Sequence, residues 1–359
     1  MGTHSLNSSP PDTDIKSLEK ATLGMRKSLR RSTALIAAMT IMSLTACGSN
    51  STDASKVRVG IYPNLVNNFD YAIADAKGFF TKNGLEVEST VINTGPDMVS
   101  ALLSGSIDVG DQSTPTVLPV ITKQKQPVSM MYGGLGLDFL MVTGPNIDAG
   151  TPNADLSAVK ALKGKTIGVT AAGALTDWFA RQLFREAGMD PDRDVTIITT
   201  GGTGSLVPAL KAGKVDAAVV WNTDKYRIGS EGTDYSVVAS VIDGTAGPNF
   251  GSSLQEFYGA TPKWLDSHAT QATQYCQSIK DGWDWAVQPE NEAEVVKMLA
   301  GWVKLPESDA TKLWAEAKDR WIRHVDEETW AAQGKFVPNE TLPAWADEMY
   351  SPCQNILEG

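Results

Sequence analysis

Two short stretches, ALLSGSID at residues 101–108 and ALKAGKVD at residues 209–216, decide the fold of this chain. Both contain Ala-Leu, then a Gly, then a β-branched residue followed by Asp, and they lie 108 residues apart. Each predicts a helix that ends at the glycine and a strand that starts at the β-branched residue. One copy alone would be a common helix-to-strand turn. Two copies, at the same place in two successive blocks, predict two lobes of like topology.

Strands and helices are expected to alternate around both copies. Short apolar runs predict strands, and apolar residues at helical spacing predict helices. In the first block we expect strands at 57–61, 85–92 and 107–110, and helices from Asn67 or Asn68 to Phe80, over 95–104 and from Pro115. In the second block we expect strands at 165–170, 195–199 and 215–221, and helices at 175–187 and 205–212. This alternation predicts an α/β protein with parallel sheets.

The chain is expected to be helical from about Trp264 onward. Apolar residues recur at helical spacing over 264–287, 290–304, 307–322 and 326–334. Eight of the ten Trp residues lie in this region. Core packing is the expected role of these Trp residues, with an aromatic ligand surface as the alternative.

The N-terminus reads as an export signal. Four basic residues between Arg26 and Arg31 precede an uncharged stretch at 32–44, and Leu44-Thr45-Ala46-Cys47 resembles a bacterial lipobox. We therefore expect 1–47 to be a lipoprotein leader, Cys47 to be lipidated, and 48–55 to be a tether. The expected location is the outer face of the cell membrane, or its periplasmic side. The start at Met1 or Met25 stays open, and the alternative for Cys47 is burial at the end of an apolar helix.

Composition excludes several classes of function. A length of 359 residues predicts about two domains, and a net charge of −11 argues against a nucleic-acid binder. Three Cys and three His leave little material for a metal cluster. Gly164-Lys165-Thr166 lacks the first Gly of a phosphate-binding loop, and Gly202-Thr203-Gly204 lacks the third Gly of a dinucleotide fingerprint. We expect no catalytic residue, no metal and no cofactor, and a monomeric chain.

Cys276 and Cys353 would remain after lipidation of Cys47. An exported location permits a disulfide between them, which would pin the C-terminal tail. The alternative is two free thiols.

Five ordered stretches carry a resemblance to a known family: VRVGIYPN (57–64), AKGFFTKNGLEVE (76–88), ALLSGSIDVGDQSTP (101–115), LKGKTIGVTAAGALTDWFARQLFREAGMDP (162–191) and ALKAGKVDAAVVWN (209–222). Together they resemble the solute-binding components of bacterial ABC importers of the nitrate, sulfonate and taurine type. That family also includes binders of thiamine-related pyrimidines.

The resemblance implies a two-lobed periplasmic-binding-protein fold, type II-like, with a helical C-terminal region. Lobe I would comprise 56–145 and be completed by 246–359, and lobe II would comprise 146–245. The chain would pass between the lobes near 143–150 and 240–250. A small molecule would be held between the lobes, and lobe closure would be the signal read by the ABC permease subunits.

Ligands of open α/β sheets bind beyond the carboxyl ends of the strands. This rule selects Tyr62, Asn64, Asp111, Gln112, Ser113, Ala172, Gly173, Thr176, Trp221 and Asn222 as candidate ligand-binding residues. Gly136 is a further candidate because the glycine-rich stretch 133–136 lets the backbone come close to a ligand, with a flexible turn as the alternative. The small residues before the helix at 175–187 favour an anion at its N-terminus, with Tyr62 and Trp221 as flat walls. The alternatives are a helix-capping role for Thr176 and Asp111 and inter-lobe packing for Trp221.

The expected function is therefore capture of a small organic anion, a sulfonate or a carboxylate. Nitrate is disfavoured because Tyr62 and Trp221 would crowd so small an ion. A pyrimidine binder of the same fold is the main alternative. A surface lipoprotein without a ligand and an enzyme on this fold rank lower. The related eukaryotic pyrimidine synthases use a Cys-rich segment that has no match here.

Overall fold

A computed structural model describes residues 55–358, except residues 146, 233, 251–253 and 337–340. The predicted leader, Cys47 and all but the last residue of the predicted tether lie outside the described residues. Asn50–Gly359 forms one compact unit. None of the helices in the described ranges is long and apolar enough to span a membrane.

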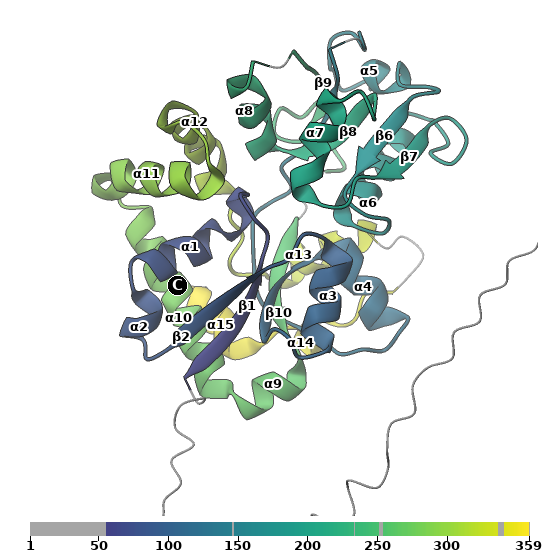
Figure 1. The fold of residues 1–359 in the computed structure, drawn as a ribbon. Helices are drawn as coiled ribbons and strands as arrows, with labels where there is room; N and C mark the ends of the chain where they lie inside the picture. The colour runs from purple at the N-terminus through teal and green to yellow at the C-terminus, as the bar shows by residue number, and fades with distance from the viewer. Residues whose placement is uncertain (1–54, 146, 233, 251–253, 337–340, 359) are drawn as a thin grey trace, which may run out of the picture. The chain divides into compact units, whose positions relative to one another are not determined.

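The described strands form two five-stranded sheets (Figure 1). The first has the order β2-β1-β3-β10-β4, from β1 (Lys56–Ile61), β2 (Glu86–Val91), β3 (Val109–Ser113), β4 (Ser129–Gly133) and β10 (Glu256–Ala260). The second has the order β7-β6-β8-β5-β9, from β5 (Phe139–Thr143), β6 (Thr166–Val169), β7 (Thr196–Thr199), β8 (Ala217–Trp221) and β9 (Ser236–Ser240). We call the parts built on these sheets lobe I and lobe II. In each sheet, three parallel strands are followed by an antiparallel one, β10 or β5.

The two-lobed α/β fold that the sequence predicts is confirmed, but the chain passes between the sheets earlier than expected. β5 pairs with β8 and β9, so residues 139–143 belong to the second sheet and not to the first. The first passage therefore lies at 134–138 instead of 143–150. The return lies between β9 and β10, over 241–255, and overlaps the expected 240–250. β5 follows the first passage and belongs to the second sheet, and β10 follows the return and belongs to the first sheet. This exchange of β5 and β10 joins the lobes by two adjacent segments of chain.

The Asp residues that end the two repeated stretches, Asp108 and Asp216, make the same kind of hydrogen bond in both lobes. Asp108 accepts a hydrogen bond from the backbone N–H of Arg58 in β1 at 2.9 Å. Asp216 accepts one from the backbone N–H of Thr166 in β6 at 2.8 Å. Gly105 and Gly213, at φ 72° and 64°, end the preceding helices in the left-handed region that favours glycine. The shared pattern thus fixes where the third strand of each sheet meets the first.

Helices cover both sheets (Figure 1). In lobe I, one face of the sheet packs against a core that includes Tyr275 and Ile279 of α10, and the other against α3 and α4. The helices of lobe I and the C-terminal region are α1 (Phe69–Ala76), α2 (Phe79–Lys82), α3 (Gly95–Leu103), α4 (Thr114–Thr122), α9 (Pro262–Ser267), α10 (Ala269–Ala286), α11 (Glu292–Val303), α12 (Glu307–Ala317), α13 (Glu327–Ala332), α14 (Trp345–Glu348) and α15 (Ser351–Leu357). Those of lobe II are α5 (Ser157–Lys160), α6 (Leu175–Glu186), α7 (Leu206–Lys211) and α8 (Asn222–Ser230).

The Trp-rich helices pack as core. Trp283 and Trp314 are buried against each other with ring centroids 5.7 Å apart. Trp302 donates from its indole N–H to the carbonyl oxygen of Leu65 at 2.7 Å. None of the eight C-terminal Trp residues lines the cavity between the lobes that is described below. Trp283, Trp314 and Trp330 are buried in the core, and the other five pack against it while partly exposed, which agrees with the expected packing role.

Backbone hydrogen bonds and close backbone contacts hold the segments that connect the lobes. Gln255 donates its N–H to the carbonyl oxygen of Leu135, and Gly136 donates its N–H to that of Arg320 at 2.8 Å. A Cβ on Gly133 would lie 2.1 Å from the carbonyl oxygen of Ile322. Glycine is required at this end of β4 because the backbone at Ile322 lies directly against it.

The structure contains the disulfide between Cys276 of α10 and Cys353 of α15. Both residues are fully buried. The disulfide closes the C-terminal tail onto lobe I, as expected, and excludes the alternative of two free thiols.

Candidate functional site

A cavity of about 30 Å³ lies between the two lobes. Lobe I contributes Tyr62, Asn67, Asn93, Thr94, Gly95, Ser113 and Glu256, and lobe II contributes Thr170, Ala174, Leu175, Thr176, Thr203 and Trp221. A cavity needs roughly 10–15 Å³ to hold one water. The cavity therefore has room for a group of only a few atoms while the lobes stand as they do here, and a larger ligand requires them to part.

Two helix N-termini meet at the cavity, one from each lobe. Gly95 begins α3, and Leu175 begins α6, and both residues line the cavity. The first N–H groups of a helix have no partner within it, and the helix end carries about half a positive charge. On the side of lobe I only the Gly95 N–H is left to donate, because Pro96 has no N–H and the Asp97 N–H donates to Thr94 Oγ1 at 3.3 Å. Positive potential faces the cavity from both helix ends.

Each of these helices also has a carboxylate in its first turn. Asp97 accepts a hydrogen bond from the Thr94 hydroxyl at 2.5 Å at the start of α3. Asp177 accepts one from the Gly173 N–H at 2.9 Å and pairs with Arg181 at 2.8 Å. The predicted anion position at Ala172 and Gly173 is thus partly satisfied by the protein's own Asp177.

Glu256 is the one carboxylate among the residues that line the cavity, and these residues include no Lys or Arg. It is 2% exposed and lies opposite Ser113 across the pair β3–β10. Asn67 donates from Nδ2 to Glu256 Oε2 at 2.6 Å, while Oε1 is buried without a protein partner. Burial raises the pKa of Glu256 well above its ordinary value, and the charges of Asp111 and Asp138 raise it further.

Tyr62 is tied to a buried polar network behind the cavity. Its N–H donates to Asn68 Oδ1 at 2.7 Å, and Asn68 Nδ2 donates to Asp111 at 3.0 Å and to the Tyr258 hydroxyl at 2.7 Å. The Tyr258 hydroxyl in turn donates to Asp70 at 3.0 Å. Asn68 stands at the N-cap position of α1, but its side chain makes no capping hydrogen bond and holds Tyr62 in place instead.

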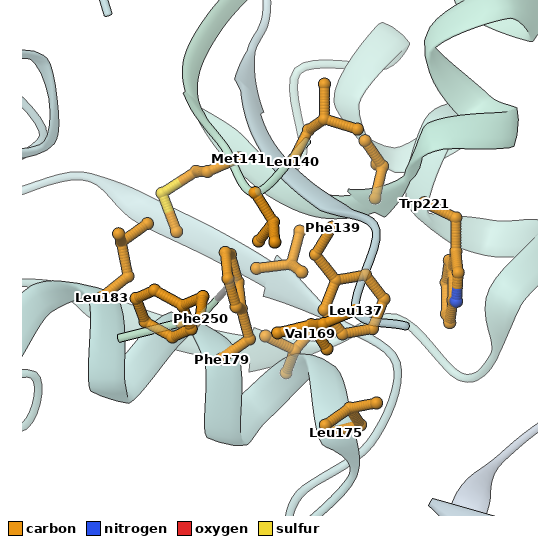
Figure 2. Packing of buried hydrophobic residues seen from close by; sticks show 14 of the residues in the cluster. Leu137, Phe139, Leu140, Met141, Val169, Leu175, Phe179, Leu183, Trp221 and Phe250 are labelled. Atoms are coloured by element: carbon orange, nitrogen blue, oxygen red, sulfur yellow. The ribbon is translucent and has the colours of Figure 1, made fainter. Parts of the chain in front are cut away.

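Trp221 is both a cavity wall and a core residue. Its ring stands edge-on to Phe139, with centroids 5.2 Å apart, and Phe139 contacts Phe179 in the same way (Figure 2). Leu175 lies near this cluster (Figure 2). Only 7% of Trp221 is exposed. The core of lobe II thus holds the indole rigidly at the cavity.

Four of the eleven predicted ligand-binding residues line the cavity: Tyr62, Ser113, Thr176 and Trp221. Thr176 does not cap α6, whose N-cap residue is Ala174; its hydroxyl instead accepts from the Thr170 N–H at 3.0 Å. Ala172 and Gly173 do not line the cavity and are exposed.

The other predicted residues have different surroundings. Asn64 accepts a hydrogen bond at its carbonyl oxygen from Arg227 at 2.9 Å, and Gly136 lies in the connection between the lobes. Asn222 donates to Glu316 of α12 at 2.6 Å. Asp111 and Gln112 are fully buried in lobe I and do not line the cavity.

Sequence reasoning missed Asn67, Asn93, Thr94, Gly95, Thr170, Ala174, Leu175, Thr203 and Glu256 as cavity residues. Thr94 and Gly95 could have been found, because Thr before Gly-Pro at a helix start is an N-cap pattern. Glu256 could not, since it stands on an unpredicted strand that returns from the second lobe. In the described part of the chain, no group of acidic, His or Cys side chains could hold a metal ion.

Comparisons with known proteins agree with this geometry. The bicarbonate-binding protein CmpA of Synechococcus sp. is 22% identical over 281 residues, which cover 72% of this chain and 59% of CmpA. This chain thus spans less than two thirds of the length of that relative.

Two solved structures show the same fold. The periplasmic aliphatic sulphonate binding protein SsuA of Escherichia coli has a TM-score of 0.60 at 19% identity, covering 79% of this chain and 91% of SsuA. The periplasmic nitrate-binding protein NrtA of Synechocystis has a TM-score of 0.62 at 18% identity, covering 85% of this chain and 86% of NrtA.

A family model described as NMT1/THI5 like matches residues 67–293, which is more than half of the chain and includes strands of both sheets. The chain belongs to the NMT1/THI5-like family.

Proposed function

We propose that this protein is the extracytoplasmic substrate-binding component of an ABC importer, which captures a small anion between its lobes and delivers it to a permease. The observation that carries the proposal is the cavity between the lobes, at the N-termini of α3 and α6. Each helix end contributes about 0.3–1 kcal/mol to binding an anion, and up to about 2 kcal/mol when partly buried.

The relatives support this proposal by the nature of their ligands. The names of CmpA, SsuA and NrtA refer to bicarbonate, an aliphatic sulphonate and nitrate, and all three are anions. The small cavity favours an anionic head of a few atoms, and this reopens nitrate, which the sequence had disfavoured. A sulfonate or carboxylate with a longer body is accommodated if the lobes part around Tyr62 and Trp221.

The proposed role is binding of a ligand, which the names of the relatives support. Neither His268, which stacks on Trp264 with ring centroids 5.2 Å apart, nor His324 lines the cavity. Export by the predicted leader and anchoring through a lipid on Cys47 would hold the binding unit at the membrane surface, next to the permease. Cys47→Ser would then release the protein from the membrane, and a lipid-labelled, membrane-bound variant would contradict this.

A thermal-shift screen of the purified chain tests the ligand class. The panel contains nitrate, bicarbonate, methanesulfonate, taurine, benzoate and 4-aminopyrimidine. A ligand at 100 times its Kd adds about 2.7 kcal/mol to stability. Stabilisation by at least one anion, lost in a Trp221→Ala variant but kept in an exposed control such as Glu290→Gln, is the expected result. No stabilisation by any anion would contradict the proposal.

One observation favours a second candidate, an aminopyrimidine. The unpartnered Oε1 of Glu256 would accept a hydrogen bond from an exocyclic amine if the carboxyl is ionised, and the rings of Tyr62 and Trp221 suit a flat ligand. The two candidates make opposite demands on Glu256, since an anion requires it to be neutral and an amine is best bound when it is charged.

A further inference from the structure

The cavity contains a contradiction if its ligand is an anion. It is lined by one buried carboxyl, Glu256, and by no Lys or Arg among the described residues that surround it. An ionised carboxylate in contact with a desolvated anion is strongly repelled, because like charges in a low-dielectric site interact at short range. The neutral acid has the opposite effect, because it presents an O–H donor.

The hydrogen bonds around Glu256 decide which oxygen would hold the proton. Oε2 accepts from Asn67 Nδ2 at 2.6 Å, so Oε2 is already the acceptor of the carboxyl. Oε1 is buried without a hydrogen-bond partner, and so is Nε2 of the neighbouring Gln255, whose side chain acts on this carboxyl and lowers the pKa of Glu256 against the effect of burial. Glu256 belongs to β10, beside the passage between the sheets at 134–138. A Cβ on Gly134 would lie 3.1 Å from the Cγ of Glu256. These contacts hold the carboxyl at the junction of the lobes. When Oε1 is protonated, its O–H is free to donate a hydrogen bond.

We propose that ligand capture is linked to proton uptake at Glu256: one proton from the solvent binds Oε1 as the anion enters, and the O–H donates to an anion oxygen. The proposal rests on the proposed function and adds to it the residue that selects for hydrogen-bond-accepting oxyanions. No covalent bond changes, and the complex of neutral Glu256 and anion carries the charge that ionised Glu256 carries alone.

The charged groups around Glu256 act in the same direction. Asp111 of β3 and Asp138 of the passage at 134–138 raise the pKa of Glu256. Burial raises the pKa of Tyr62, so Tyr62 stays a neutral hydroxyl. Arg320 acts on Asp138 and donates to the carbonyl oxygen of Leu137 at 2.6 Å. Asp97 and Asp177, at the starts of α3 and α6, contribute further negative charge.

The test measures Kd against pH from 5 to 9 by calorimetry on the purified chain, with nitrate and methanesulfonate as probes, because neither probe titrates in this range. For the wild type, affinity is expected to be constant at low pH. Above the pKa of Glu256 in the free protein, Kd should rise by up to tenfold per pH unit. Glu256→Gln, which is neutral at every pH, should bind independently of pH. Glu290→Gln, an exposed control with the same charge change, should behave like the wild type.

A second measurement does not depend on the variant folding. Wild-type titrations in triethanolamine and in Tris, two cationic buffers that differ in heat of ionisation and do not compete as anions, count the protons taken up on binding. Uptake approaching one proton at the upper end of the pH range supports the proposal. Anion binding that is independent of pH and takes up no proton overturns it while leaving the proposed function intact. Binding of 4-aminopyrimidine but of no anion, with affinity that increases with pH, overturns both.

Discussion

Removal of the disulfide between Cys276 and Cys353 should lower stability by an amount set by the loop that it closes. The two residues are 77 positions apart. The loop-entropy relation gives about 4.5 kcal/mol at 25 °C for a loop of this length, and measured disulfides typically contribute about 2–4 kcal/mol. We therefore expect Cys276→Ala/Cys353→Ala to lose between about 2 and 4.5 kcal/mol.

The folded state should survive this change, because α15 has other attachments. The Tyr350 N–H donates to the carbonyl oxygen of Met130 at 2.7 Å. Gln354 donates from Nε2 to the carbonyl oxygen of Met131 at 2.9 Å and accepts at Oε1 from the Val325 N–H at 2.9 Å. These bonds keep the tail against β4, so the effect of the disulfide falls mainly on the unfolded chain.

Urea unfolding followed by Trp fluorescence measures the difference. The double Ala variant should unfold at lower urea, with a native spectrum and with ligand binding like that of the wild type. Reductant should lower the stability of the wild type by a similar amount and leave the variant unchanged, which is the matched control. A loss below about 1 kcal/mol, or a variant with a non-native spectrum, would refute the reasoning.

Three further predictions concern single residues. Arg227 joins α8 to the carbonyl oxygens of Asn64 at 2.9 Å and Val303 at 3.2 Å, so Arg227→Ala should weaken ligand binding about tenfold and enlarge the radius of gyration in small-angle scattering; an unchanged Kd would count against this clasp. Ala172→Asp should change Kd less than about twofold, because Ala172 lies outside the cavity lining; a loss of binding would restore the anion position first expected there. Burial raises the pKa of Asp70 from 3.8 to about 7, so the folded chain holds the extra proton and stability should fall as pH rises from about 4 to about 7; Asp70→Asn should flatten that slope in thermal unfolding, and an equal slope in both proteins would refute the assignment.

The local pattern of the sequence predicted several of the strands closely. β1, β2, β6 and β7 lie within one residue of their expected bounds, since each is a short apolar or alternating run with a turn on both sides. β3 and β8 start two residues later than expected, because Asp108 and Asp216 bond the neighbouring strand as the chain enters the ladder. β4, β9 and β10 were missed as strands.

The candidate site could be predicted only in part. Tyr62, Ser113 and Trp221 end strands whose carboxyl ends face the other lobe, and the rule for open sheets finds such residues. Glu256 lies at the start of a strand that runs antiparallel, so the same rule passes over it. Asn67 and Thr203 lie in segments whose approach to the cavity depends on how the neighbouring helices pack, whereas Thr94 has the N-cap pattern described above.

The sequence by itself determined the two-lobe plan, because a helix that ends in Gly and a strand entered through Asp are set by contacts within a few residues. Only the tertiary structure decided the exchange of β5 and β10 and the place of Glu256. These depend on chain segments far apart in sequence, and which of them meet is set by the packing of whole elements. The burial that raises the pKa of Glu256 exists only once both lobes surround it.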